Sequence, residues 1–451
     1  MGAFHAYDIR GIYNVDFDRE TAYKVGFFLP HLLETDKVLV GRDARLSSPQ
    51  IRDALVEGIT DAGASVTDIG LATTPMVYYA TASYGFKASV QITASHNPKE
   101  YNGMKVSTSN ALPVGKENGL GLIEEWIKSG KECRKEKQKG NVEFLDIRAG
   151  YIAFQMKYLK DCSSLKIGMD LSNGMAALVI KDIMKQAGGE ISYIFDTIDG
   201  TFPGHDPNPL VAANIVKLQE LVIQQKCDIG VIYDGDADRV MFTDETGRFI
   251  SPDLMIALMG HYWLEEKGLR GKVLQDIRSS KAVGEYLEPM GAKMETWKVG
   301  RAFAARKLRE IEGIYGGELA GHYYFRDFFY SDSGIMASLI ILGIVSRLKA
   351  DGIKLSQAIA KIEKYRNSGE INFRIEQKEQ AMEAVCNYFK NEEQPTAFMD
   401  FDGYRVEFRQ WWFNIRPSNT EPYLRFIAEA TTTELLEQKV EKAREIISEF
   451  R

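Results

Sequence analysis

The sequence predicts an α/β protein made of three similar mixed α/β domains and a smaller C-terminal α+β domain. The chain has 451 residues, whereas a single hydrophobic core stops growing at about 250–300 residues. Three segments repeat one order of apolar strand, Asp-containing polar loop, helix, glycine and second strand. The residues after position 365 break this order, which predicts a separate and smaller fourth domain.

The three repeats begin with apolar strands predicted at residues 38–40, 166–170 and 273–276. In each repeat the predicted helix is followed by a glycine, which tolerates the left-handed conformation that ends a helix. These glycines are Gly63, Gly188 and Gly291. Alternating strands and helices imply right-handed crossovers and largely parallel sheets. A chance resemblance between ordinary α/β segments is the alternative at this point.

The C-terminal part has a different predicted order. It reads as a helix at 354–365, strands at 371–375 and 404–408, and a final helix at 433–450. Thr431 and Glu434 form the Thr-x-x-Glu pattern of a capping box, which is typical of a helix start. We therefore place domains at residues 1–145, 146–249, 250–365 and 366–451.

Composition limits the possible partners. Lys and Arg total 56 against 63 Asp and Glu, a formal net charge of −7, and an acidic surface disfavours non-specific binding to nucleic acid or anionic membranes. The four cysteines include no CxxC pair, which argues against a zinc ribbon and favours a reducing compartment. The N-terminus is polar, and no strongly apolar stretch is long enough to cross a bilayer. We expect a cytoplasmic monomer or homodimer.

The first candidate motif spans residues 93–98 and follows the apolar segment 88–92. Its Asn-Pro pair is a turn signal, so Ser95 should lie on a tight loop at a strand end. A serine there can act as a nucleophile or a phosphate carrier. His96 is not expected to pair with it, because neighbours in sequence rarely face each other. An ordinary turn serine is the alternative.

The second motif follows the apolar segment 229–233 and contains Asp234, Asp236 and Asp238. Carboxylates this close together repel each other unless a cation neutralises them. Three hard oxygen ligands suit Mg²⁺ or Mn²⁺. An EF-hand calcium loop is excluded, because its sixth position needs glycine and holds Arg239. A solvated acidic turn is the remaining alternative.

Two further motifs could bind substrate. Residues 317–322 place glycines beside Glu318 and His322, which could bind sugar hydroxyls or simply form a buried turn. The fourth motif combines guanidinium, hydroxyl and amide donors suited to a phosphate, or is a plain surface loop. Its candidate residues are Arg416, Ser418, Asn419 and Thr420. Other basic residues could bind an anion or be solvated surface charges: Arg10, Arg42, Arg45, Lys105, Arg278 and Arg301.

Together these motifs, with residues 6–11 and 324–327, resemble the α-D-phosphohexomutase superfamily, in its phosphomannomutase/phosphoglucomutase branch. They occur in the family's order across nearly the whole chain. The resemblance implies four domains around a central cleft, with one loop from each domain in the site. It also implies an isomerase that interconverts hexose 1-phosphate and hexose 6-phosphate, of mannose or glucose, through a hexose 1,6-bisphosphate that also serves as activator.

The resemblance further implies residue roles. Ser95 would be the phosphoserine, with Arg10 and Lys105 as catalytic neighbours. One Mg²⁺ would be held by Ser95 and the three aspartates. The substrate-binding residues would be Glu318, His322, Arg416, Ser418, Asn419, Thr420, Arg239 and Arg301.

Two positions depart from the family pattern. Ala320 stands where the family usually has serine, and Arg301 stands where many relatives have histidine. These departures leave the preferred hexose open, and a phosphoglucosamine mutase is one alternative. A metal-dependent sugar-phosphate phosphatase and a non-catalytic sugar-phosphate-binding relative are others. The phosphatase has no need for a second phosphate clasp, and the intact Ser95 and aspartates oppose the non-catalytic reading.

Overall fold

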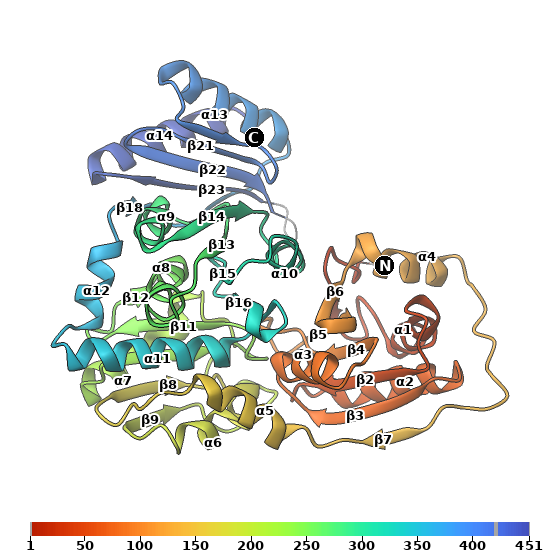
Figure 1. The fold of residues 1–451 in the computed structure, drawn as a ribbon. Coiled ribbons are helices and arrows are strands. Elements are labelled where there is room, and N and C mark those ends of the chain that lie inside the picture. The colour runs from red at the N-terminus through yellow and green to blue at the C-terminus, as the bar shows by residue number, and fades with distance from the viewer. Residues whose placement is uncertain (1, 419–422, 451) are drawn as a thin grey trace.

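A computed structural model describes residues 2–418 and 423–450 as four successive domains, each built on one sheet (Figure 1). The first three sheets mix parallel and antiparallel strands, and the strand pairs of the smaller fourth domain are antiparallel. The predicted fold class is therefore confirmed.

The first domain has strand order β1-β5-β4-β2-β3-β7, with β6 beside β5. Its strands are β1 (Ile9–Ile12), β2 (Lys37–Arg42), β3 (Ser65–Leu71), β4 (Ala88–Ile92), β5 (Tyr101–Thr108), β6 (Leu112–Val114) and β7 (Val142–Phe144). Its helices are α1 (Arg19–Leu32), α2 (Ser48–Asp61), α3 (Thr74–Ser83) and α4 (Leu120–Lys128).

The second domain has strand order β12-β11-β10-β8-β9. Its strands are β8 (Lys166–Asp170), β9 (Glu190–Ile194), β10 (Ile229–Tyr233), β11 (Val240–Asp244) and β12 (Phe249–Ile250). Its helices are α5 (Arg148–Gln155), α6 (Ile180–Met184) and α7 (Ala212–Gln225).

The third domain has strand order β14-β13-β15-β16-β17. Its strands are β13 (Gly271–Asp276), β14 (Ala292–Trp297), β15 (Tyr315–Gly317), β16 (Tyr323–Phe325) and β17 (Ser331–Asp332). Its helices are α8 (Pro252–Leu258), α9 (Lys281–Leu287), α10 (Arg301–Glu310), α11 (Gly334–Ala350) and α12 (Leu355–Ile362).

The fourth domain has strand order β18-β23-β22-β21-β20, with β19 beside β23. Its strands are β18 (Arg366–Asn367), β19 (Ile371–Phe373), β20 (Ala397–Met399), β21 (Tyr404–Glu407), β22 (Trp411–Pro417) and β23 (Leu424–Ala430). Its helices are α13 (Lys378–Glu392) and α14 (Thr433–Ser448). The side chain that caps α14 belongs to Thr432, which accepts from Leu435 N, so the predicted capping box on Thr431 is wrong by one residue. The domain boundaries themselves stay a prediction.

The three repeats occupy equivalent places in their sheets. The leading strands β2, β8 and β13 each pair in parallel with two neighbours. In each domain the chain reverses after the third parallel strand, and the next strand pairs with it in antiparallel orientation. These pairs are β4 and β5, β10 and β11, and β15 and β16. The turns are residues 93–100, 234–239 and 318–322. The first three sequence motifs therefore lie at the same position in three copies of one plan.

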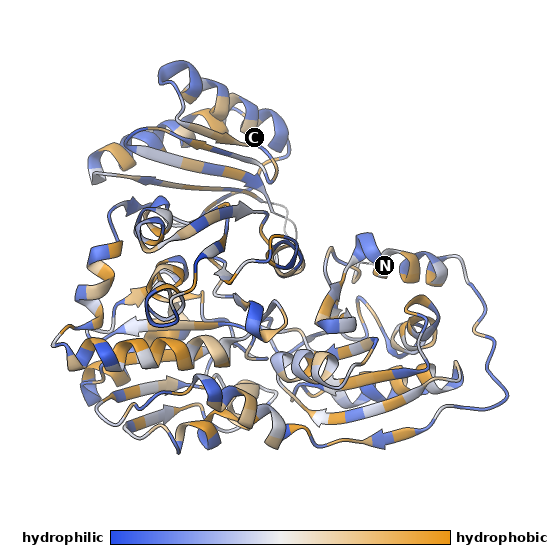
Figure 2. Cartoon of the chain, viewed as in Figure 1, coloured by the Kyte–Doolittle hydropathy of each residue, from blue (hydrophilic) through white to orange (hydrophobic). Residues whose placement is uncertain are grey.

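Core packing joins the first three domains and leaves the fourth with its own core. Helix α11 is apolar and buried along most of its length, and it packs on β10 and β11 of the second domain (Figure 2). One cluster of buried apolar residues runs through these three domains, whereas the fourth domain closes a separate cluster between its sheet, α13 and α14. None of the described helices is long and apolar enough to cross a bilayer.

Helices α1 and α2 of the first domain cross closely at Gly58. A Cβ atom there would lie 2.0 Å from Tyr23 O and 2.8 Å from Phe27 N. We expect Gly58→Ala to destabilise the first domain by about 1–3 kcal/mol, because backbone must shift to admit the methyl group. Gly284→Ala in α9 is the matched control, since its nearest neighbour would lie at an ordinary 3.4 Å. Thermal unfolding of both variants checks this; equal midpoints would contradict the close crossing.

Candidate functional site

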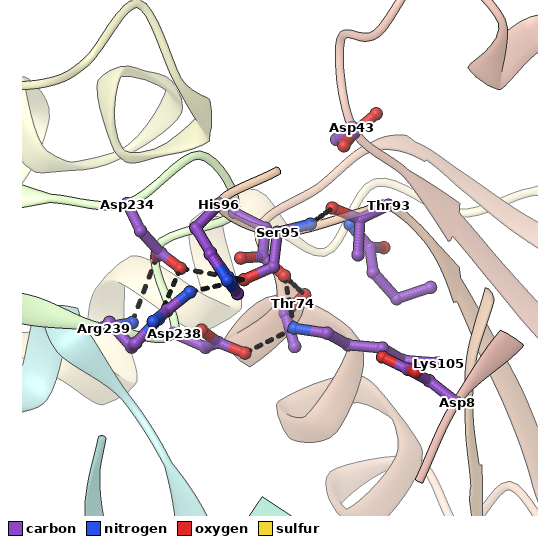
Figure 3. A network of polar contacts seen from close by, with 12 residues as sticks. Asp8, Asp43, Thr74, Thr93, Ser95, His96, Lys105, Asp234, Asp238 and Arg239 are labelled. Atoms are coloured by element: carbon purple, nitrogen blue, oxygen red, sulfur yellow. Dashed lines mark hydrogen bonds and ion pairs between the residues drawn. The ribbon is translucent and has the colours of Figure 1, made fainter. Parts of the chain in front are cut away.

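Ser95 occupies the turn between β4 and β5 in a left-handed conformation, with φ of 52°. Its side chain is buried, and Oγ donates to Asp234 Oδ2 across the interface between the first and second domains, at 2.9 Å (Figure 3). His96 Nδ1 also approaches Oγ, at 3.4 Å. The two neighbouring side chains therefore approach each other at the outer limit of hydrogen-bond distance, and the expectation that they form no catalytic pair stays a prediction.

The three aspartates of the second motif form a buried cluster. One carboxylate oxygen of each lies within 4.8 Å of the others, as metal ligands would. Lys105 Nζ from β5 donates to Asp236 Oδ2 at 2.6 Å and to Asp238 Oδ2 at 2.5 Å (Figure 3). The other oxygens of these two carboxylates are buried and have no hydrogen-bond partner in the described part of the chain. Carboxylate oxygens that accept no hydrogen bond, in a tight group, fit a divalent cation.

The pKa values in the cluster also indicate a site for a divalent cation. Burial raises the pKa values of Asp234 and Asp238, and neighbouring carboxylates raise them further. Burial would also raise the pKa of Asp236, but the charge and hydrogen bond of Lys105, together with hydrogen bonds from Thr74 and Ser95, lower that pKa below its usual value. Burial alone would lower the pKa of Lys105, whereas the two carboxylates raise it. One ammonium therefore stabilises one of the aspartates as a carboxylate, and a bound divalent cation would do so for the rest.

Two helix N-termini donate hydrogen bonds to the aspartate loop. At the start of α3, Thr74 N donates to Asp236 O at 3.0 Å, and Thr74 Oγ1 donates to the Asp236 carboxylate. At the start of α11, Gly334 N donates to Ala237 O at 3.2 Å. The positive ends of the two helix dipoles thus face the acidic loop and stabilise its negative charge.

Arg239 contacts Ser95, and Arg10 contacts Asn97 in the same turn. Arg239 donates through Nε to Asp234 Oδ2 at 3.0 Å, and its Nη2 lies 3.4 Å from Ser95 Oγ. Burial lowers the pKa of Arg239 to about 9, with the charge of Arg10 adding to the effect, so it stays cationic at neutral pH. Arg10 pairs with Asp8 at 2.5 Å and donates to Asn97 Oδ1 at 2.8 Å. Arg239 therefore places a guanidinium at Ser95 Oγ, and Arg10 places one at the Asn97 side chain of the same turn.

The third motif is joined to the aspartate loop through backbone. Arg239 and His322 form an isolated antiparallel bridge, and Val240 N donates to Gly321 O at 3.3 Å. The sugar-binding candidates of the third domain are thereby fixed relative to the aspartates and Ser95.

Each candidate side chain of the third motif has an anchoring partner. Glu318 accepts from Gly300 N at 2.5 Å and from Tyr324 Oη at 2.7 Å. His322 Nδ1 lies 2.6 Å from Asp332 Oδ2. The charge interactions with His322 lower the pKa of Asp332 despite its burial, so Asp332 is a carboxylate that can only accept. His322 therefore carries a proton on Nδ1 and can present Nε2 to a ligand.

Arg301 is buried at the start of α10, which excludes the reading of a solvated charge. Its Nη1 donates to Tyr78 Oη on α3 of the first domain, and its guanidinium lies 5.1 Å from the centre of the Tyr78 ring. Nη2 is buried without a hydrogen-bond partner among the described residues. A buried cation with one unused donor is suited to an anionic ligand.

The fourth motif lies at the end of β22. Arg416 is buried and donates through Nε to Asp402 at 3.0 Å, and the same carboxylate accepts from Val299 N of the third domain at 2.8 Å. Ser418 is half-buried, and Asn419 and Thr420 lie outside the described residues. A cavity of about 150 Å³ is lined by Tyr7 of the first domain and Phe303 of the third, whose rings contact each other edge to face.

Several supporting residues were missed by the sequence reasoning. Thr74 and Tyr78 each hold a predicted site residue from a position distant in sequence, and Asp332 holds His322 from ten residues away. Helix-start signals marked two of them, because Thr73 caps α3 and Ser333 caps α11. Nothing in the local sequence indicated a role for Tyr78, because its contact with Arg301 forms only when the first and third domains pack together.

The four domains match four family models. They are described as Phosphoglucomutase/phosphomannomutase, alpha/beta/alpha domain I (residues 1–133), domain II (147–247) and domain III (251–365), and as the C-terminal domain (370–446).

Whole-chain comparisons agree. The chain is 35% identical to a phosphomannomutase of Vibrio cholerae, over all of this chain and 99% of that protein. It is 32% identical to a phosphomannomutase of Methanocaldococcus jannaschii, over 99% of this chain and 98% of that protein. Its fold is similar to a crystal structure of a phosphoglucomutase/phosphomannomutase family protein from Burkholderia thailandensis, with a TM-score of 0.89, 26% identity, and coverage of 99% and 97% of the two chains. The chain therefore belongs to the phosphoglucomutase/phosphomannomutase family.

Proposed function

We propose that the protein is a phosphohexomutase that interconverts the 1- and 6-phosphates of mannose or glucose. The observation that carries this proposal is the buried contact of Ser95 Oγ with Asp234, beside two further aspartates and Lys105. Ser95 serves as the phosphoryl carrier. Transfer breaks the Oγ–phosphorus bond and forms a phosphorus–oxygen bond to a sugar hydroxyl, whose proton passes to Oγ and leaves Ser95 as a free hydroxyl. Return transfer from the opposite end of the bisphosphate restores phosphoserine and completes the isomerisation.

One Mg²⁺ held by the three aspartates and the phosphoryl group on Ser95 fits the donor set. When bound, it supplies positive charge that neutralises the transferring phosphoryl oxygens. Lys105, Arg239 and Arg10 add cationic donors on the side of Ser95. Positioning and charge neutralisation are the main requirements of phosphoryl transfer, and these residues meet both.

Substrate binding is assigned to the third and fourth domains. Glu318 accepts from sugar hydroxyls with its remaining lone pairs, and His322 offers Nε2. Arg416 binds the non-reacting phosphate, with Ser418, Asn419 and Thr420 as further donors. Arg301 adds a cationic donor through its unused Nη2. Two phosphate positions in one site are what a mutase needs, since the bisphosphate must react at both ends.

The test is a coupled assay on mannose 1-phosphate, glucose 1-phosphate and glucosamine 1-phosphate, with and without a hexose 1,6-bisphosphate. We expect bisphosphate-stimulated formation of the 6-phosphate of mannose or glucose. Inorganic phosphate as the main product would favour the phosphatase. A preference for glucosamine 1-phosphate would identify a phosphoglucosamine mutase. Binding without turnover would identify a non-catalytic sugar-phosphate-binding protein.

Arg416 provides a separate test of the phosphate clasp. We expect Arg416→Met to lower kcat/KM by about 10–100-fold, mostly through KM, because a charge-assisted hydrogen bond to phosphate is worth about 1.5–3 kcal/mol. Arg409→Met is the matched control, since Arg409 is exposed beyond the other end of β22. Steady-state kinetics of both variants measure the effect. An unchanged KM in Arg416→Met would remove Arg416 from the clasp.

A further inference from the structure

Arg45 lies in the polar loop after β2, and its side chain is completely buried. Its Nε donates to Asp43 Oδ2 at 3.1 Å. Of the four other hydrogen bonds of the guanidinium, three go to backbone carbonyls of the turn that carries Ser95 and one goes to the first carbonyl of β5. Nη2 donates to Ser95 O at 2.8 Å and Asn97 O at 2.7 Å, and Nη1 donates to Pro98 O at 2.6 Å and Tyr101 O at 3.1 Å. Arg45 is therefore not a solvated charge.

The turn depends on these donors. Within it, Asn97 N donates to Ala94 O and Tyr101 N donates to Pro98 O. Buried carbonyls without donors are costly, and one planar guanidinium satisfies four of them from a fixed geometry. The Ser95 carbonyl is held by Arg45 while Oγ of the same residue reaches Asp234. Arg45 thus supports the left-handed conformation that aims Oγ at the aspartates.

The second domain packs closely against Arg45 and the Ser95 carbonyl. The ring of Phe202 lies 4.9 Å from the Arg45 guanidinium. A Cβ on Gly200 would lie 2.0 Å from Ala44 O, and a Cβ on Gly235 of the aspartate loop would lie 2.5 Å from Ser95 O. Both glycines are therefore needed for the close fit around Arg45 and the Ser95 carbonyl. Arg45 thus links the Ser95 turn to the second domain, which carries the three aspartates.

We propose that Arg45 is the positioning residue that holds the phosphoryl group of Ser95 in line for transfer to the sugar. This inference rests on the proposed function, in which Ser95 carries the phosphoryl group. A misplaced phosphoserine reacts slowly with the sugar and loses more of its phosphoryl groups to water. In that loss a water oxygen bonds to phosphorus, the Oγ–phosphorus bond breaks, a water proton passes to Oγ, and inorganic phosphate leaves.

The experiment compares the parent enzyme with Arg45→Lys and Arg45→Met. Arg52→Met is the matched control, since Arg52 is an ion-paired arginine of the same domain whose partners are Asp53 and Asp68. Each protein is treated with a hexose 1,6-bisphosphate and Mg²⁺, and intact mass gives the fraction phosphorylated. Mutase kcat is then expressed per phosphorylatable site, together with KM and the inorganic phosphate released per turnover. Counting only competent sites removes the effect of partial misfolding.

For Arg45→Met we expect a fall in kcat per site of about 100-fold, since a displacement of about 1 Å near the reacting atoms can cost that much. KM should stay within about twofold, inorganic phosphate per turnover should rise, and Arg45→Lys should show a smaller change. Equal kcat per site and equal phosphate release in the Arg45 variants would overturn the inference. If Arg45→Met does not fold, Arg45→Lys and Phe202→Leu decide it by the same readouts. A parent that takes up no phosphoryl group on Ser95 would instead contradict the proposed function.

Discussion

Replacing Ser95 with alanine is expected to lower kcat by about 1,000-fold or more while leaving hexose phosphate binding nearly intact. The substitution removes Oγ, the only atom of the residue that can carry the phosphoryl group. Without that covalent intermediate, phosphoryl transfer has no other route of comparable rate. The binding candidates on the third and fourth domains are untouched. Mutase assays measure the loss in rate, and calorimetric titration with glucose 6-phosphate measures binding.

Ser109→Ala serves as control, because Ser109 is exposed just beyond β5 in the same domain. Intact mass after incubation with a hexose 1,6-bisphosphate should show one added phosphoryl group in the parent and the control, and none in Ser95→Ala. A Ser95→Ala protein that retained parental turnover would refute the phosphoserine assignment, whatever its other properties.

Asp236→Asn is expected to weaken metal dependence and rate together. The change keeps the shape of the side chain but removes one of three carboxylate charges, and also the charge that pairs with Lys105 at 2.6 Å. We expect the Mg²⁺ concentration for half-maximal activity to rise by about 10-fold or more and kcat to fall by about 100-fold, because metal and cationic donors act on the same phosphoryl charge. Titration of activity with Mg²⁺ after treatment with a chelator measures both.

The control for this variant is Asp228→Asn. Asp228 lies just before β10, at the opposite end of the strand from the aspartate loop, in a partly exposed ion pair with Lys349. It should titrate with Mg²⁺ as the parent does, since surface pairs contribute little. If Asp236→Asn also gave the parental Mg²⁺ curve, Asp236 would not be a metal ligand.

Local sequence was sufficient to place the three loops of the first three domains. The loops after β4 and β10 each follow an apolar run that forms a buried strand, and each begins where polar residues and turn signals replace that run. The loop after β15, a Tyr-Gly-Gly strand, was marked instead by its glycines beside Glu318 and His322. The glycines at the helix ends, Gly63 and Gly291 among them, have positive φ values as expected. Helix ends were less predictable, and the cap of α14 falls on Thr432 because either of two adjacent threonines could serve.

Local sequence could not predict which residues contact each other between distant parts of the chain. His96 approaches Ser95 Oγ within a turn in which Ser95 is left-handed, and Arg45 donates to a carbonyl of that turn from a loop 50 residues earlier in the chain. Whether Arg301 was a surface charge or a buried cation also had no local signal, since its partner Tyr78 lies in another domain. Each of these outcomes depends on which carbonyls and rings the packing of the domains leaves in reach.

The sequence by itself determined the α/β plan, its threefold repetition, and the chemical types gathered in each loop, because these follow from hydrophobic periodicity, turn residues and charge. Only the tertiary structure decided which of those groups meet. It brings Ser95 and Lys105 from the first domain onto aspartates of the second, and fixes His322 of the third beside them. The physical reason is that a buried charge is tolerable only with a partner at close range, and those partners come from distant parts of the chain.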